Sequence, residues 1–71
     1  MVSIKKEMFE ILKNNPHKKY DAWDMYEIFD KDPKTMQRYL LLLQKRYENI
    51  WFERSINGMK FYYKNERAEE K

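Results

Sequence analysis

The sequence predicts a small α+β domain, in which a three-helix bundle is followed by a C-terminal β-hairpin. Three apolar patterns with helical spacing occupy residues 3–47, and only three residues separate the second from the third. Beyond them, two strand-like runs flank Asn57-Gly58, a strong signal for a two-residue hairpin turn. The chain of 71 residues is expected to form one domain over 1–64, followed by a charged tail over 65–71.

The first helix is expected over residues 4–15. Ser3 is a suitable N-cap, and a proline at position 16 ends the helix because the residue before proline disfavours helical backbone. The inward stripe consists of Ile4, Met8, Ile11 and Leu12, with Phe9 on its flank. A basic loop over residues 16–20 follows.

The second helix is short, about residues 22–29. Asp21 and Asp24 stand three apart, which is a carboxylate version of the capping pattern. The residues expected to face inward are Met25, Ile28 and Phe29. The connector Asp30-Lys31-Asp32 is so tight that this helix and the next one form a predicted helix-turn-helix.

The third helix, over residues 32–47, has two different faces. Asp32 can cap it, and proline at position 33 suits the first helical position. The apolar stripe consists of Met36, Leu40, Leu43 and Tyr47. The opposite side carries Lys34, Arg38 and Lys45, flanked by Thr35, Gln37 and Leu41. One side can therefore hold the core while the other offers cations and hydrogen-bond donors.

The hairpin is expected over residues 50–64, with a type I′ turn at Asn57-Gly58. That turn would pair Ile56 with Met59, Arg54 with Phe61, and Phe52 with Tyr63 on the face toward the core. On the other face it would pair Trp51 with Lys64, Glu53 with Tyr62, and Ser55 with Lys60.

Charge is unevenly distributed along the chain, although the formal net charge is only +3. Residues 21–32 hold five carboxylates and one lysine, whereas residues 33–64 hold seven cations and two carboxylates. A basic helix and hairpin thus follow an acidic segment, which favours a polyanionic partner.

Several functional classes are disfavoured by composition. The chain has no cysteine and one histidine, which excludes a cysteine-based metal site and a histidine cluster. It has neither a glycine-rich phosphate loop nor a Ser/His/Asp set, so we predict a protein that is not an enzyme and has no cofactor or metal. No run approaches the roughly 20 apolar residues that span a bilayer, and no signal-peptide pattern is present, so we predict a cytoplasmic protein.

The stretch DPKTMQRYLLLLQKRYENIWFER (residues 32–54) resembles the segment that runs from the recognition helix to the wing in winged helix-turn-helix domains. The resemblance covers about residues 3–64 and is to a pattern of cap, polar and apolar positions. By length and composition it is most similar to small transcription regulators of archaea and their viruses, and a viral protein would work in the host cytoplasm. The family often has glycine where this chain has residues 47–49.

The resemblance implies sequence-specific binding of double-stranded DNA by a homodimer, with the third helix in the major groove and the hairpin as wing. Arg38 would then bond guanine edges and Gln37 adenine, while Leu41 would meet a thymine methyl group. The expected phosphate contacts are Lys34, Thr35 and Lys45 from the helix, and Arg54, Lys60, Lys18 and Lys19 from the wing and the basic loop.

Two other functions remain open from the residues. Leu41, Leu42 and Trp51 are predicted to be exposed, so the same fold could be a protein interaction module or use these residues in a dimer. Trp51, Tyr62 and the lysines of the wing could instead stack on single-stranded nucleic acid. For Trp51, stacking of Lys64 over the indole ring and contact with a partner are both consistent with the sequence.

Overall fold

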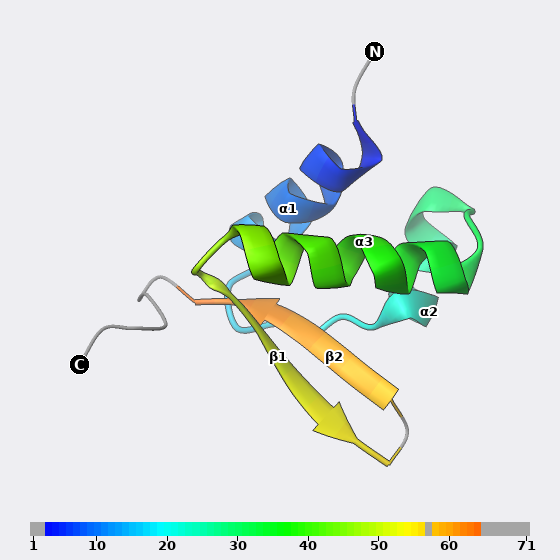
Figure 1. Ribbon diagram of the computed structural model, residues 1–71. Coiled ribbons are helices and arrows are strands. Elements are labelled where there is room, and N and C mark those ends of the chain that lie inside the picture. The colour runs from blue at the N-terminus through cyan, green and yellow to red at the C-terminus, as the bar shows by residue number, and fades with distance from the viewer. Residues whose placement is uncertain (1–2, 57, 65–71) are drawn as a thin grey trace.

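Three helices are followed by a two-stranded antiparallel hairpin, as Figure 1 shows. The computed structural model describes residues 3–56 and 58–64, so the predicted tail over 65–71 lies outside the described residues. The elements are α1 (Ile4–Asn14), α2 (Ala22–Phe29), α3 (Pro33–Arg46), β1 (Ile50–Ser55) and β2 (Gly58–Tyr63). This order confirms the predicted small α+β fold.

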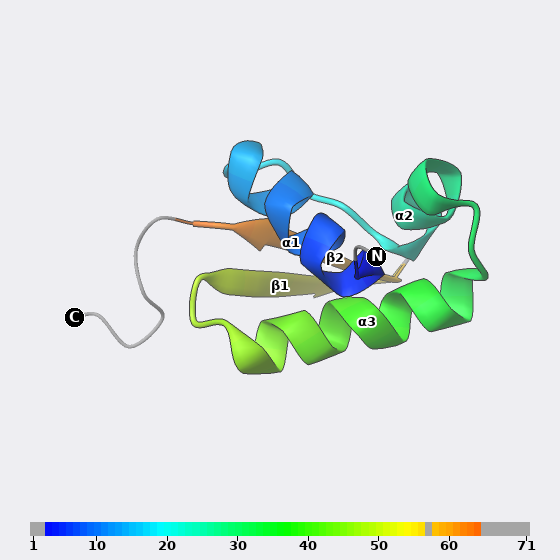
Figure 2. The same ribbon diagram turned by 90° about the horizontal axis from the view of Figure 1, so that it is seen from above.

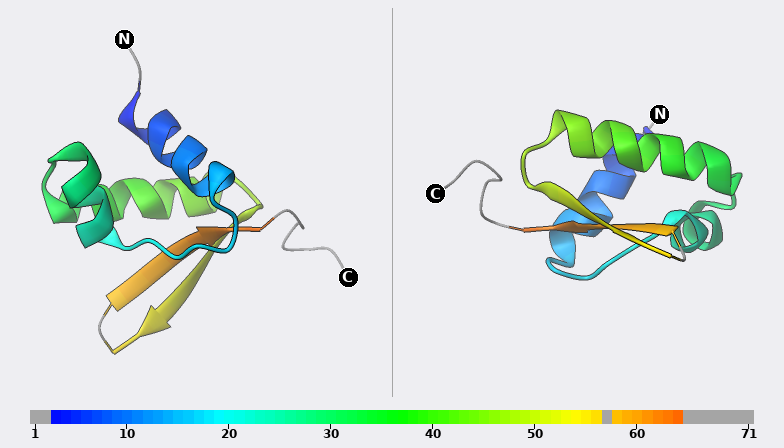
Figure 3. Two further views of the ribbon diagram at one scale, coloured as in Figure 1. Left: turned by 180° about the vertical axis from the view of Figure 1, so that it is seen from behind. Right: turned by 60° about the horizontal axis from the view of Figure 1, so that its bottom comes forward.

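The longest helix, α3, lies at the surface of the molecule. The other two helices lie on one side of it, and its other side faces solvent. In Figure 1 α1 and α2 lie behind α3 and the hairpin extends below it, and the view from above in Figure 2 shows the same order of layers. Figures 1 and 3 show the hairpin running away from α3 toward the side of the molecule where α2 lies, with its turn projecting beyond the helices. One side of α3 is therefore free of other elements along its length.

The ends of α2 and α3 are set by the predicted carboxylate caps. The backbone N–H of Asp24 donates to Asp21 Oδ1 at 2.9 Å, and the N–H of Asp21 donates to Asp24 Oδ2 at 3.0 Å, which completes a capping box. For α3, the N–H of Thr35 donates to Asp32 Oδ2 at 3.3 Å. In α1, by contrast, Ser3 stands at the N-cap position but its side chain makes no capping hydrogen bond.

The core lies where α1, α2 and α3 face the base of the hairpin. It consists of Met8, Leu12, Tyr20, Ala22, Met25, Met36, Leu40, Leu43, Ile50 and Phe61. No buried residue of the described part is charged, so this small core is held by apolar burial alone. Of the predicted inward stripe of α3, Met36, Leu40 and Leu43 are buried, whereas Tyr47 is the C-cap residue and is half-buried.

The predicted hairpin register is wrong. The observed pairs are Ile50 with Tyr63, Trp51 with Tyr62, Phe52 with Phe61, Glu53 with Lys60, Arg54 with Met59 and Ser55 with Gly58. The strands are therefore joined through residues 56 and 57, one position earlier than predicted. Gly58 belongs to β2 and has φ of +134°, a conformation that favours glycine. Asn57 itself lies outside the described residues.

Packing of Phe61 explains why the local turn signal did not set the register. Phe61 is fully buried, and the predicted register would place it opposite the charged Arg54. The observed register places it opposite Phe52, with ring centroids 6.1 Å apart, and sets Glu53 opposite Lys60 on the other face. Because the two registers differ by an even step, the residues that pair in the observed strands keep their predicted faces.

The basic loop before α2 adds a short extended segment to the other edge of β2. The sequence did not predict this pairing. The N–H of Tyr20 donates to the carbonyl of Phe61 at 2.8 Å, and the N–H of Phe61 donates to the carbonyl of Tyr20 at 2.7 Å. Nearby, the N–H of His17 donates to the carbonyl of Tyr63 at 2.8 Å. The backbone of β2 is thus hydrogen-bonded on both edges at Phe61 and Tyr63, whereas nearer the tip the described backbone hydrogen bonds of β2 run to β1.

Four predicted exposures need correction. Ile56 was expected on the hairpin face toward the core, but it lies in the turn and is fully exposed. Ile28 was expected to face inward but its side chain is 49% exposed, because the short α2 is covered on one side only. Phe52 was expected in the core and is 41% exposed. Leu41 was expected to be exposed, yet it is half-buried and packs against the core on the flank of α3.

Candidate nucleic-acid interface

The outward face of α3 carries the cations that the sequence singled out. Lys34, Arg38 and Lys45 are all exposed, while Thr35 and Gln37 are half-buried at the edges of this face. Because the opposite stripe of α3 is anchored in the core, the helix cannot rotate these side chains inward without losing buried apolar contacts. The position of the cations is therefore a direct result of the two-faced sequence of α3.

A shallow groove of about 340 Å³ runs along this face. It is lined by Lys34, Gln37, Arg38, Leu41, Leu42 and Lys45. All but Leu42 are residues that the sequence predicted to contact DNA, and α3 alone brings them together.

Three elements meet in a second hollow, of about 400 Å³, at the N-terminal half of α3. Its lining combines the start of α2, the first turns of α3 and the tip of the hairpin: Asp21, Ala22, Trp23, Pro33, Lys34, Gln37, Arg38, Gly58 and Met59. Because Lys34, Gln37 and Arg38 line this hollow and the groove, the two form one continuous concave surface. We call this surface the α3 face.

The acidic segment beside the α3 face does not neutralise it. Three of its five carboxylates, those of Asp21, Asp24 and Asp32, accept backbone hydrogen bonds at helix starts. Within the described residues, Lys34 and Arg38 form no ion pair with any of them.

Asp21 is the one carboxylate that lines the hollow, and Lys60 holds it. Lys60 Nζ lies 3.2 Å from Asp21 Oδ2. Partial burial raises the pKa of Asp21, but the hydrogen bond from the Asp24 backbone and the Lys60 ammonium outweigh it, so the net pKa is lowered. Lys60, a predicted DNA contact, is therefore already engaged in compensating a negative charge at the α3 face.

Lys19 is engaged in the same way at the other edge of the hairpin. Its Nζ lies 2.6 Å from Glu53 Oε1 and 5.7 Å from the ring centroid of Tyr62. The hydrogen bond to Glu53 and the negative charge of that carboxylate raise the pKa of Lys19. The neighbouring Lys18 is exposed and lies over the ring of Tyr20 at 5.3 Å.

The structure thus divides the predicted DNA contacts into two groups. Lys34, Arg38 and Lys45 on α3, together with Arg54 near the hairpin tip, are exposed and form no ion pair with any residue in 3–56 or 58–64. Lys19 and Lys60 are paired with acids of the chain itself. Among the predicted DNA contacts, most of the unpaired positive charge therefore lies on α3, and the hairpin adds Arg54.

Trp23 is a residue of the α3 face that the sequence reasoning missed. Its side chain is 64% exposed, lines the hollow beside Lys34 and Arg38, and meets the ring of Tyr26 edge-on at 5.8 Å. A helical projection would have found it, since Trp23 lies about 160° from the buried Met25. An exposed indole beside unpaired cations is a strong candidate for a binding contact.

The aromatic residues of the hairpin are less available than predicted. Lys64 Nζ lies 4.4 Å from the ring centroid of Trp51, so the predicted stacking of this lysine is present. The indole is half-buried, and its N–H is buried without a hydrogen-bond partner among the described residues. With Leu41 half-buried as well, Leu42 is the one residue of the predicted protein-binding set that is clearly open, at 44% exposed.

No known protein family, curated protein or solved structure gave a significant match to this chain. Among residues 3–56 and 58–64, no three or more His, Cys, Asp or Glu side chains are grouped so that they could hold a metal ion. A search of the same residues found no helix with the length and apolar character needed to cross a membrane.

Proposed function

We propose that the chain is a winged-helix protein that binds double-stranded DNA in a sequence-specific way and regulates transcription, without catalytic activity. The observation that carries the proposal is the α3 face, where Lys34, Arg38 and Lys45 project from one side of a helix and remain free of the acids packed nearby. A cationic helix face that follows a tight turn is the arrangement that reads a major groove.

The dimensions of α3 suit this role. Its 14 residues give a length of about 21 Å, and a helix of about 10–12 Å diameter enters a major groove about 12 Å wide. Most of α1 and α2 lies behind α3 in Figure 1, and the start of α2 reaches the edge of the α3 face with Trp23.

Each side chain of the α3 face has a distinct proposed task. Arg38 and Gln37 lie at its centre and would read base edges, guanine and adenine respectively. Lys34 and Lys45 stand toward its two ends and would hold phosphates of the flanking backbone. Leu41 is accessible only at the bottom of the groove, where a thymine methyl group could reach it.

The hairpin and the basic loop would act mainly by charge. Arg54 and Lys18 are available for phosphates, whereas Lys60 and Lys19 would contribute by compensating Asp21 and Glu53. Because these two lysines compensate the two carboxylates, an approaching phosphate would meet less repulsion. We further propose a homodimer on a two-fold symmetric site, the usual way in which such domains extend their contact.

The test is selection of bound duplexes from a randomised pool, followed by fluorescence anisotropy with the selected duplex. Arg38→Ala should lower affinity at least tenfold and relax the preference at one base pair. Gln37→Ala should relax the preference at a different position. Lys13→Ala, which removes an exposed lysine of α1 outside the α3 face, serves as the matched control. Equal loss in Arg38→Ala and Lys13→Ala would contradict the proposal.

The second candidate function is protein binding through the same surface, and the exposure of Leu42 and Trp23 favours it. Both border the α3 face, so a protein partner would cover the unpaired cations as well. Leu42→Gln would then weaken a complex seen by size-exclusion chromatography while removing none of the cations proposed to bind the duplex. Loss of duplex binding with no protein complex in the wild type would favour DNA instead.

A further inference from the structure

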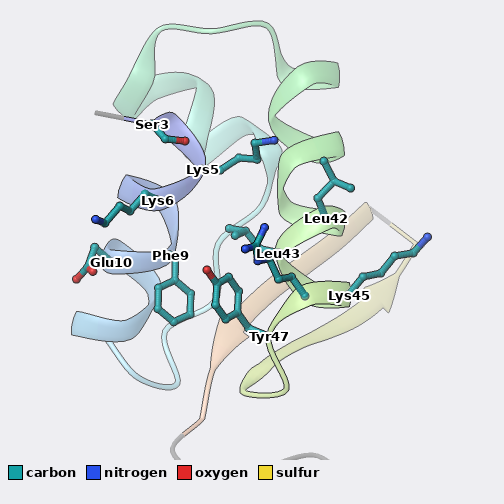
Figure 4. A pocket seen from close by; sticks show the side chains of 10 residues that line it. Ser3, Lys5, Lys6, Phe9, Glu10, Leu42, Leu43, Lys45 and Tyr47 are labelled. Atoms are coloured by element: carbon teal, nitrogen blue, oxygen red, sulfur yellow. The ribbon is translucent and has the colours of Figure 1, made fainter. Parts of the chain in front are cut away.

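A second concave surface adjoins the α3 face along the C-terminal half of α3 and shares Leu42 and Lys45 with it. It is a cleft of about 630 Å³ between α1 and the C-terminal half of α3, shown in Figure 4. Its floor is apolar and consists of Phe9, Leu42, Leu43 and Tyr47. We call it the α1–α3 cleft. Its volume lies within the range of pockets that take small molecules.

The floor of the α1–α3 cleft is held in place by stacked rings. The rings of Phe9 and Tyr47 are stacked with centroids 4.2 Å apart, and Tyr63 meets Phe9 edge-on at 6.0 Å. Figure 4 shows Phe9 and Tyr47 facing each other between the two helices. This aromatic floor is preformed, so an apolar group that binds there need not order it first.

The rim of the cleft is strongly cationic. It carries Lys5, Lys6, Lys45 and Arg46, against the single carboxylate of Glu10. Figure 4 shows Lys5 reaching from α1 toward α3, with Lys6 and Lys45 at the outer margins. The start of α1 adds partial positive charge, because Ser3 lines the cleft without capping the helix.

Two of these cations are fixed by aromatic rings and not by acids. Lys5 Nζ lies 5.2 Å from the ring centroid of Tyr39, and the Arg46 guanidinium lies 5.9 Å from that of Tyr47. Such contacts position a cation while leaving its charge uncompensated. Neither side chain has an ion-pair partner in the part of the chain that the structure describes.

We propose that the α1–α3 cleft binds a small amphipathic anion, that is, an acyl or aryl group carrying a carboxylate, sulfonate or phosphate. The apolar part lies on the Phe9–Tyr47 floor, and the anionic group is held between Lys5 and Arg46. The rim charge selects an anion over a neutral compound, and the floor selects an apolar body over a simple inorganic ion.

The probe for the test is anilinonaphthalene sulfonate, with its uncharged analogue phenylnaphthylamine as reference. The wild type should bind one sulfonate probe per chain, saturably, and should bind the uncharged analogue much more weakly. Lys5→Gln and Arg46→Gln should each lower the affinity for the sulfonate about two- to fivefold, whereas the matched control Lys13→Gln should not. Equal binding of the two compounds would overturn the proposal.

A second pair of variants tests the floor without disturbing the core. Leu42→Glu places a negative charge in the cleft, of the same sign as the sulfonate, and should lower sulfonate binding at least fivefold. Ile28→Glu is the matched control, since Ile28 is 49% exposed and Leu42 44%, and both lie on helices. The same loss in both variants would overturn the proposal. So would a chain that sediments as a dimer and binds no probe, because a second copy would then occupy the cleft.

One consequence rests on the proposed function. Lys45 lines both the α1–α3 cleft and the α3 face, so a bound anion and a DNA phosphate would compete for its charge. Saturating sulfonate probe should weaken duplex binding by the wild type severalfold and by Lys45→Gln much less. If no duplex binds but the sulfonate does, the proposed function fails and the cleft stands. If duplex binds and the sulfonate does not, only the cleft proposal fails.

Discussion

Replacement of Lys34 by glutamine gives the most direct quantitative test of the α3 face. Lys34 is exposed in the first turn of α3, and it forms no ion pair with the residues that the structure describes. Its whole charge is therefore free to neutralise one phosphate and to release the counterions bound there. Each phosphate neutralised on duplex DNA contributes about 0.9 to the slope of log affinity against log salt.

The expected loss of affinity for Lys34→Gln follows from that slope. If the contact contributes nothing at about 1 M salt, its loss weakens binding about eightfold at about 0.1 M, about 15-fold at about 0.05 M and about fourfold at about 0.2 M. For Lys34→Gln, the slope of log affinity against log salt should be shallower by about 0.9 than for the wild type, and the base preferences should be unchanged.

The assay is fluorescence anisotropy with a labelled duplex at four or more salt concentrations, for the wild type, Lys34→Gln and Lys13→Gln. Circular dichroism establishes that the variants are folded. Parallel salt lines for the wild type and Lys34→Gln would refute the reasoning, because a lysine that touches phosphate cannot be removed without a change in slope. An equal change in Lys13→Gln would also refute it, since the effect would then come from net charge alone.

Four further predictions concern the fold that supports this face. Leu40→Ala should cost about 2–5 kcal/mol in urea unfolding, because Leu40 is fully buried, whereas Leu42→Ala should cost well under 1 kcal/mol. Asp21→Ala should cost about 1 kcal/mol at neutral pH. Since the pKa of Asp21 is lowered in the folded state, this difference should be complete above the ordinary carboxyl pKa of about 3.9 and should vanish as the pH falls through the lowered value, which melting curves between pH 2 and 7 would check. Gly58→Ala should cost about 1 kcal/mol in urea unfolding through its backbone alone, because φ is +134° and no atom lies within 4 Å of an added Cβ. Trp23→Phe should remove most of the tryptophan fluorescence that acrylamide quenches, while Trp51→Phe should leave it; the opposite result would mean that the exposures of the two indoles are misassigned.

The helices could be read from the sequence because their signals are local. Asp21 with Asp24, and Asp32 with Pro33, fix two helix starts within a few residues of chain, and both starts are found in the structure. The stripe of α3 is equally local, so the cationic face opposite it could be predicted residue by residue.

The remaining features depend on contacts between distant parts of the chain. The hairpin register is set by the burial of Phe61 against Tyr20, which outweighs the turn signal of Asn57-Gly58. The pairing of Lys60 with Asp21 spans 39 positions and could not be inferred from either neighbourhood. A helical projection of the sequence could have predicted that Trp23 is exposed. The α1–α3 cleft could not be predicted in this way, because it depends on the angle at which two helices pack.

The bridge between Tyr20 and Phe61 has a mechanical consequence for the hairpin. At its base, β2 lies between β1 and the segment that contains Tyr20, and its backbone is hydrogen-bonded to both. The base of the strand is therefore fixed to the connection between α1 and α2. Between Phe61 and the tip, β2 pairs with β1, and the Lys60 ammonium links it to Asp21 at the start of α2. Salt weakens a surface ion pair of this kind but leaves backbone hydrogen bonds intact, so the attachment of the outer part of β2 to the helices should be more sensitive to ionic strength than that of its base.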